Sequence, residues 1–273
     1  MKLYNLSFAL GFLFYIVATL GYVSSFILRR ENLGKLGFFF SVFGFLLHTL
    51  SLFIRITEFG HPPISNLYES LSFFAWTVVL IYLFIEGRVK LKIIGVFALP
   101  FVSFLLGWAS FMDSQIRPLP PALRSFWLGI HGGLCFTSYA SFTLAFYFGL
   151  MYLLQEKEVK TKRIGGFFFR LPSLAVLDKL SYRTVTFGFI LLTLGIISGS
   201  IWASQAWGAF WSWDPKETWS LVTWLIYVFY LHARLMRGWR GRKSAYLTII
   251  GFLMVIFTYL GVSFLLPGLH SYL

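Results

Sequence analysis

Histidine and tryptophan are the residue types of this 273-residue sequence whose spacing predicts chemistry. Of the five histidines, four lie in or beside long apolar runs: His48, His131, His232 and His270. An ionisable side chain inside a membrane span is a functional candidate, because its burial costs free energy unless it is paired. The alternative for each histidine taken alone is a neutral imidazole that only hydrogen-bonds a neighbouring helix. The fifth, His61, is interpreted as a loop residue.

The tryptophans gather in one stretch, "WGAFWSWDPKETWSLVTW" (207–224), which holds five of the ten in the chain. An aromatic belt at a membrane surface is the structural alternative, because tryptophan favours that interface. A belt spreads around a protein, and it accounts for the tryptophans near helix ends. It does not account for three that share one loop, namely Trp207, Trp211 and Trp213. We call residues 205–219 the tryptophan loop.

His131 and His270 flank the tryptophan loop in the sequence, and both are expected at one surface of the membrane. Imidazole is a common axial ligand of haem iron, and indole faces pack against planar macrocycles by offset stacking. These residues together therefore predict a haem at that surface. His232 lies near the opposite leaflet and would bind iron only at a second site. Zinc or non-haem iron fits less well, since no CxxC or HxxxH spacing occurs.

The elements that must position these residues are membrane helices. Apolar residues make up 58% of the chain and charged residues 12%, about half the charged fraction of a soluble domain. Apolar runs recur, each long enough to cross about 30 Å of hydrocarbon. We predict an all-α, polytopic membrane bundle of about eight transmembrane helices, with the first run kept as a span rather than cleaved. The expected helices are 3–28, 36–57, 68–86, 91–111, 127–154, 182–204, 219–236 and 245–266.

The basic residues predict the orientation of these helices. Most of the 23 Lys and Arg residues lie in four segments: 29–35, 86–92, 155–183 and 233–243. Such segments face the cytoplasm or its equivalent, so both termini and the tryptophan loop are expected outside. This bias explains the net charge of +13 without invoking nucleic acid. Segment 155–183 is either an interfacial stretch on anionic lipid or a docking surface for a partner.

Residues 214–217, "DPKE", have a structural interpretation of their own. Asp214 is a predicted N-cap, Pro215 occupies N1 and Glu217 occupies N3, which is a capping-box pattern. A firmly capped helix start holds the preceding indoles in place, and its free N–H groups favour anions such as haem propionates. Asn66 is predicted to cap another helix in the same way, with Glu69 at N3.

Arg55 lies seven residues after His48, so the two share a helix face. Arg55 could meet a propionate or pair with Glu58 or Glu69, and the sequence leaves these alternatives open. The single cysteine, Cys135, excludes a dithiol redox couple within this chain.

At "WGAFWSWDPKETWSLVTWLIY" the sequence resembles the tryptophan-rich (WWD) domain of the haem-handling proteins of cytochrome c biogenesis. The form W-G-x-x-W-x-W-D-P-K-E-T-W is similar to the CcsA/ResC type of System II maturation. The resemblance extends over most of the chain. It includes "SNLYESLSFFAW" (65–76), "IHGGLCFTSYASFTLAFYFGLMYLL" (130–154), "YLHARLMRGWRGR" (230–242) and "GLHSYL" (268–273).

The resemblance implies roles for individual residues. His131 and His270 match the two outer histidines that bind haem iron against the tryptophan loop. His232 matches a transmembrane histidine that binds haem entering from the inner side. A partner subunit supplies the other ligand of that deeper site in the family, and His48 is a poor substitute because of its depth. The cofactor-binding set implied here is His131, His270, His232, Trp207, Trp211, Trp213, Asp214 and Trp219.

Together these features predict one integral membrane cytochrome c assembly domain over 1–273. Its expected function is that of the haem-binding subunit of a cytochrome c synthase, which moves haem b outward and presents it for thioether attachment to apocytochrome c. The expected partners are a second System II membrane subunit (CcsB/ResB type), apocytochrome c, thiol-reducing proteins and the lipid membrane. Two alternatives stay open: a haem exporter without attachment activity, and a membrane scaffold whose tryptophans form only a belt. A bacterial cytoplasmic membrane and a thylakoid membrane are both compatible.

Overall fold

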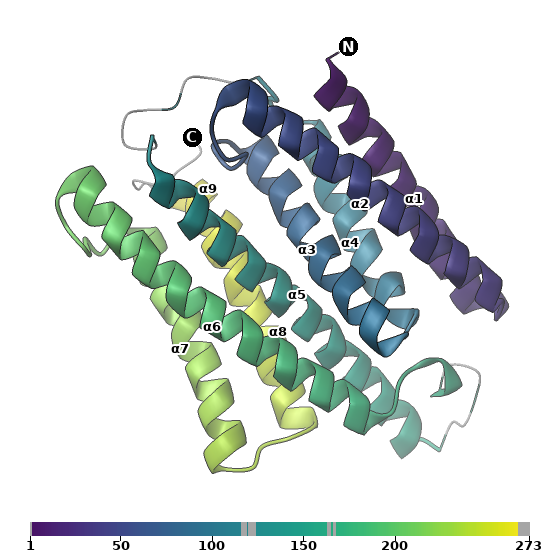
Figure 1. Cartoon of the computed structure of the whole chain (residues 1–273). Coiled ribbons are helices and arrows are strands. Elements are labelled where there is room, and N and C mark those ends of the chain that lie inside the picture. The colour runs from purple at the N-terminus through teal and green to yellow at the C-terminus, as the bar shows by residue number, and fades with distance from the viewer. Residues whose placement is uncertain (1, 116–118, 120–123, 163–164, 166–167, 267–273) are drawn as a thin grey trace. The chain divides into compact units, whose positions relative to one another are not determined.

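The computed structural model describes residues 2–115, 119, 124–162, 165 and 168–266, and every regular element within these ranges is a helix (Figure 1). This confirms the predicted all-α class. The chain divides into two compact units, residues 1–120 and 121–273, which are described separately below. The interpretation of residues 1–273 as one assembly domain stays a prediction.

The first unit consists of four helices that follow one another through short connections. They are α1 (Leu3–Leu28), α2 (Glu31–Phe59), α3 (Leu67–Val89) and α4 (Ile93–Ser110). Helix α1 packs along α2 and α4, and α3 packs on α4 and α2. Asn66 caps α3, as predicted, by accepting a hydrogen bond from the backbone N–H of Glu69.

Helices α1 and α2 approach closely because glycines face each other across the contact. A Cβ atom built on Gly11 would lie 3.2 Å from the carbonyl oxygen of Gly44. A Cβ atom on Gly44 would in turn lie 2.9 Å from the ring of Tyr15, which is fully buried. Small residues at such positions are how membrane helices gain van der Waals contact.

Polar side chains are buried inside this apolar unit, and two sets of them are paired with each other. Arg55 and Glu69 form an ion pair of 2.7 Å in which both side chains are at most 2% exposed. The Nε2 atom of His48 lies 2.9 Å from the hydroxyl of Ser72. The structure thus decides the partner of Arg55 in favour of Glu69, because the N-terminus of α3 brings that carboxylate beside α2.

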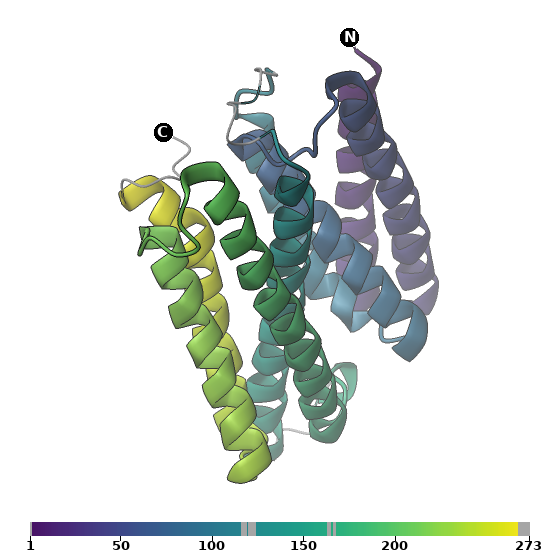
Figure 2. The ribbon, with the colours of Figure 1, turned by 60° about the vertical axis from the view of Figure 1, so that its left-hand side comes forward.

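The second unit contains α5 (Phe126–Lys160), the short 3-10 turn η2 (Phe168–Arg170), α6 (Leu174–Trp207) and α7 (Pro215–Met236). It ends with α8 (Arg242–Ile256), which continues through the π-helical turn η3 (Phe257–Gly261) into α9 (Val262–Leu265). Figures 1 and 2 show α5, α6, α7 and α8 running side by side.

Aromatic packing and one buried hydroxyl join the helices of this unit. The rings of Phe142 (α5) and Tyr227 (α7) stack with centroids 3.6 Å apart and an interplanar angle of 7°. The hydroxyl of Ser138 donates to the carbonyl oxygen of Gly188 at 2.8 Å, which ties α5 to α6. These contacts fix the frame from which the functional candidates project.

Seven segments of the described chain are long and apolar enough to cross a membrane, namely α1 to α6 and the stretch Arg242–Leu265. Helix α7 is not among these segments, because its many polar and aromatic residues lower its mean hydropathy. Helices α5 and α6 extend into the basic segment predicted between spans, α5 to Lys160 and α6 from Leu174. A helix needs no apolar residues to continue past the membrane, so the apolar pattern underestimates its length.

Candidate functional site

His131 lies near the start of α5, six residues after the N-cap Ser125. Its Nδ1 atom is 2.8 Å from the carbonyl oxygen of Gly195 on α6. Since a carbonyl oxygen only accepts, Nδ1 carries the proton and the lone pair belongs to Nε2. Room for the ring comes from Gly199, where a Cβ atom would lie 2.7 Å from Nδ1.

Two indoles extend the aromatic surface from His131 into the tryptophan loop. The centroid of Trp202 lies 5.9 Å from that of His131, and Trp207 lies a further 5.9 Å from Trp202. Trp202 is buried at 3% exposure, whereas Trp207 is half-buried. Helix α6 ends at Trp207 with Gly208 in the left-handed conformation, so the chain turns sharply into the loop.

The loop then presents two further indoles at right angles. The rings of Trp211 and Trp213 lie 5.8 Å apart with an interplanar angle of 88°. Trp213 is 69% exposed and has a φ of +59°, a conformation that is uncommon for a bulky residue. Such strain persists only where the surroundings impose it, and it clusters at functional sites.

The capping box predicted for the next helix is present and follows Trp213 directly. Asp214 accepts from the backbone N–H of Lys216 at 2.9 Å, and the carboxylate of Glu217 accepts from the backbone N–H of Asp214 at 3.3 Å. Glu217 also accepts from the backbone N–H of Ser212 at 2.8 Å. One carboxylate therefore fastens both the helix and the loop before it.

The far end of the α8–α9 segment lies against the same loop. The ammonium of Lys216 donates to the hydroxyl of Ser263 on α9 at 2.9 Å. The indole of Trp219 lies edge-on to Phe257 at 4.6 Å, and its carbonyl oxygen accepts from the hydroxyl of Thr258 at 3.2 Å. The π-helical turn η3 thus packs against the start of α7.

The structure brings His131 and the tryptophan loop to the same end of the second unit. His270, the other predicted outer ligand, lies outside the described residues. His232 is exposed near the end of α7 and lies in a stripe of exposed apolar side chains. His48 belongs to the first unit and is 1% exposed, between the rings of Phe8 and Tyr15.

One polar cluster was not predicted from the sequence. Arg234 on α7 forms a two-point ion pair with Asp178 on α6, with N···O distances of 2.9 and 2.5 Å, and Asp178 also accepts from the backbone N–H of Gly241. Asp178 is the only acid between Glu158 and Asp214. That isolation within a basic segment is a signal that could have indicated the pair.

Comparisons with known proteins identify the family of this chain. The model of the family described as cytochrome c assembly protein matches residues 64–270. The chain belongs to this family. The matched range takes in α3 to α9 and includes His131, His232, His270 and the whole tryptophan loop.

Similar members of the cytochrome c assembly family come from algae and cyanobacteria. The cytochrome c biogenesis protein CcsA of Guillardia theta is 38% identical over 99% of this chain and 96% of its own length. The CcsA of Synechococcus sp. strain CC9902 is 43% identical over 83% of each chain, and that of Heterosigma akashiwo is 42% identical over 80% of this chain.

A solved structure described as the cytochrome c haem lyase CcmF has a similar fold, with a TM-score of 0.69. The two sequences are 17% identical, so this likeness concerns the fold alone. The match covers 94% of this chain but only 46% of the solved one. This chain therefore aligns with just under half the length of that protein.

Proposed function

We propose that this chain is the haem-binding membrane subunit of a cytochrome c synthase, which moves haem b to the outer face of the membrane and presents it to apocytochrome c. Membership of the cytochrome c assembly family and the names of the CcsA relatives support a role in cytochrome c maturation. The haem-binding role is argued below from the residues of the second unit.

The proposal rests on the hydrogen bond between the ring of His131 and the backbone of Gly195. A histidine that binds a metal commonly donates its second ring N–H to a carbonyl or carboxylate, which fixes the ring and raises its basicity. His131 does so to Gly195, at 2.8 Å. Its Nε2 lone pair is therefore the one that would bind haem iron, with Trp207, Trp211 and Trp213 packing on the macrocycle.

His270 is proposed as the second axial ligand at this outer site. It follows Leu266 by four residues, so the chain can carry it at most about 14 Å from that position. Helix α9 lies beside the tryptophan loop through Ser263 and Lys216, so the reach of this segment includes the neighbourhood of the loop. The capped N-terminus of α7 with Asp214 and Trp219 would hold the loop around the propionate end.

His232 is proposed as a ligand of a second haem, on the inner side. Its exposed neighbours on α7 are apolar, with Leu225 51%, Phe229 49% and Met236 72% exposed. Among the described residues, this face of α7 is exposed, and we propose that a partner subunit of the CcsB/ResB type completes the site there. The second ligand would come from that partner.

Attachment requires two thiols of apocytochrome c to add to the vinyl groups of haem. This chain would bind and orient the substrate, which raises the rate by positioning. The single cysteine of the chain leaves the supply of reducing equivalents to separate thiol-reducing proteins. We place the tryptophan loop on the periplasmic or lumenal side of a bacterial or thylakoid membrane.

An absorption spectrum of the protein purified with its partner tests haem binding. We expect a Soret band that weakens strongly in His131→Ala. The band should be unchanged in the control His61→Ala, because His61 is a loop residue whose Nδ1 contacts the carbonyl oxygen of the next residue, Pro62, at 3.0 Å. Absence of a Soret band from the wild-type complex would reject the proposal and leave the scaffold interpretation.

A second measurement separates a synthase from a haem exporter. The purified complex is mixed with haem, reductant and an apocytochrome that carries a Cys-x-x-Cys-His segment. A synthase yields covalent holocytochrome that keeps its haem under denaturing electrophoresis. Delivery of free haem without covalent product would assign the exporter function instead.

A further inference from the structure

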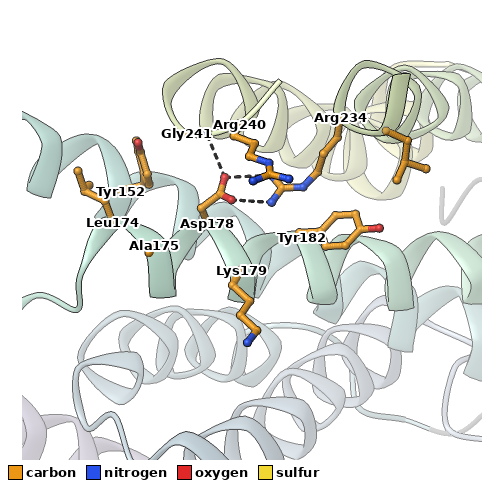
Figure 3. A pocket seen from close by; sticks show the side chains of 10 residues that line it. Tyr152, Leu174, Ala175, Asp178, Lys179, Tyr182, Arg234, Arg240 and Gly241 are labelled. Atoms are coloured by element: carbon orange, nitrogen blue, oxygen red, sulfur yellow. Dashed lines mark hydrogen bonds and ion pairs between the residues drawn. The ribbon is translucent and has the colours of Figure 1, made fainter. Parts of the chain in front are cut away.

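A cavity of about 630 Å³ opens at the end of the second unit opposite the tryptophan loop. It lies between α6, the end of α7 and the connection from α7 to α8, with one residue from α5 (Figure 3). Its lining residues are Tyr152, Leu174, Ala175, Asp178, Lys179, Tyr182, Arg234, Leu235, Arg240 and Gly241. None of them belongs to the haem sites proposed above.

The lining has an excess of positive charge. Three basic side chains line the cavity against one carboxylate, that of Asp178. Both oxygens of Asp178 are already engaged by Arg234, and one also accepts from the backbone N–H of Gly241 at 2.9 Å. The charges of Lys179 and Arg240 therefore exceed what the carboxylate can balance.

The pair between Asp178 and Arg234 makes this a formed site rather than a loose basic patch. The guanidinium of Arg234 lies 4.5 Å from the ring centroid of Tyr182, so an aromatic face and a two-point ion pair fix it together. Figure 3 shows Arg240 beside Asp178, with Lys179 extending from α6 in the other direction. The cavity thus has a rigid polar centre with cations on either side.

The rest of the lining is apolar and continues onto exposed apolar surface. Leu174, Ala175 and Leu235 line the cavity, and Leu235 is 66% exposed. A ligand with an anionic head and an apolar body matches this combination of charge and surface. A small free anion would use the cations and leave the apolar rim without a function.

We propose that this cavity binds the phosphate headgroup of an anionic membrane lipid, with its acyl chains along the apolar rim formed by Leu174, Ala175 and Leu235. Arg240 would contact the phosphate beside the Asp178–Arg234 pair, and the ammonium of Lys179, which extends in the other direction from α6, would add attraction at longer range. The basic segments at this end of the unit are those expected on the cytoplasmic side, where anionic lipids attract Lys and Arg.

Native mass spectrometry of the full-length protein tests the proposal. The protein is reconstituted with equal amounts of phosphatidylglycerol and phosphatidylcholine, extracted, and analysed for retained lipid. Loss of a charge-assisted contact weakens binding by roughly tenfold or more. We expect retained phosphatidylglycerol to exceed phosphatidylcholine, and the ratio to fall by about that factor in the double variant Lys179→Ala, Arg240→Ala.

The matched control is Arg183→Ala, Arg237→Ala, which removes the same charge from exposed positions at this end of the unit that do not line the cavity. It should keep the wild-type ratio. A milder pair, Lys179→Gln and Arg240→Gln, keeps side-chain bulk, and a melting temperature for every variant identifies loss of folding. Equal retention of the two lipids by the wild type would overturn the proposal.

Two further arms identify the source of the anion. Inorganic phosphate at millimolar concentration should not displace the lipid, and its doing so would assign the cavity to a free anion. Haem b added to the lipid-loaded protein should likewise leave the bound phosphatidylglycerol in place. Displacement by haem that depends on Lys179 and Arg240 would assign the cavity to porphyrin carboxylates and reject the lipid.

Discussion

The Nδ1 atom of His131 and the carbonyl oxygen of Gly195 lie 2.8 Å apart and join α5 to α6. This hydrogen bond fixes the tautomer of the imidazole and ties the orientation of a candidate iron ligand to the packing of two helices. It also gives the carbonyl a partner from another helix, in addition to the hydroxyl of Ser198 at 2.9 Å. Changes in α6 should therefore alter haem binding without touching the histidine.

Gly199→Ala provides such a change. The new Cβ would lie 2.7 Å from Nδ1 of His131, so the ring must move and its hydrogen bond to Gly195 must weaken. Loss of an outer-shell partner commonly lowers metal affinity by about 10–100-fold, and we expect haem affinity to fall within that range in a titration followed at the Soret band. Gly133→Ala is the control, because a Cβ there meets no atom of the described residues within 4 Å. Equal effects of both substitutions would contradict this explanation.

Trp213 permits a test that separates its backbone from its ring. Its φ of +59° disfavours any residue with a Cβ, by about 1–2 kcal/mol. We expect Trp213→Gly to be more stable than Trp213→Ala by about that amount, while both lose haem retention relative to wild type. Thermal unfolding in detergent measures the first effect and the Soret absorbance the second. Equal stability of the two variants would show that the left-handed backbone is not imposed on the residue.

The buried ion pair of the first unit should be sensitive to the loss of one partner. Arg55→Met leaves the carboxylate of Glu69 buried without its cation, which costs about 3–5 kcal/mol in comparable pairs. Replacing both residues by methionine should recover most of the loss, because no uncompensated charge remains. Unfolding of the two single variants and the double variant measures the coupling. Additive effects would mean that the pair contributes no coupling of its own.

Asp214→Ala removes the N-cap of α7. We expect a loss of about 1 kcal/mol of stability and faster amide hydrogen exchange in residues 208–213, since the same helix start fastens the preceding loop. Asn66→Ala is the comparison, because it removes an equivalent cap in the other unit. Faster exchange near residue 213 in the Asn66 variant would indicate global destabilisation rather than a local effect.

Much of the fold follows from patterns that the sequence displays openly. Long apolar runs predict the spans, and "DPKE" and "SNLYE" predict the two caps, because capping depends on residues that are close in the sequence. The apolar runs predict an end for α5 and a start for α6 that lie too close to the membrane: α5 continues to Lys160, and α6 begins at Leu174. Hydropathy reports where a helix meets lipid and carries no information on how far it continues into water.

The candidate site could be predicted only in part. The chemistry of histidine and tryptophan and their positions in the sequence indicated His131 and the tryptophan loop. The contact between His131 and Gly195, in contrast, depends on how two helices pack. The pair between Asp178 and Arg234 is likewise long-range, with a sequence separation of 56. No local pattern specifies which cation an acid will meet across a helix interface, so such pairs emerge only from the folded chain.

The π-helical turn η3 sets the rotation of α9 relative to α8. A π-turn accommodates one residue more than an α-helical turn, and each α-helical residue corresponds to a rotation of about 100°. The segment beyond Gly261 is therefore out of phase with α8 by that angle. Deleting Leu260 would restore the phase and move Ser263 away from Lys216, while every candidate ligand stays in the sequence.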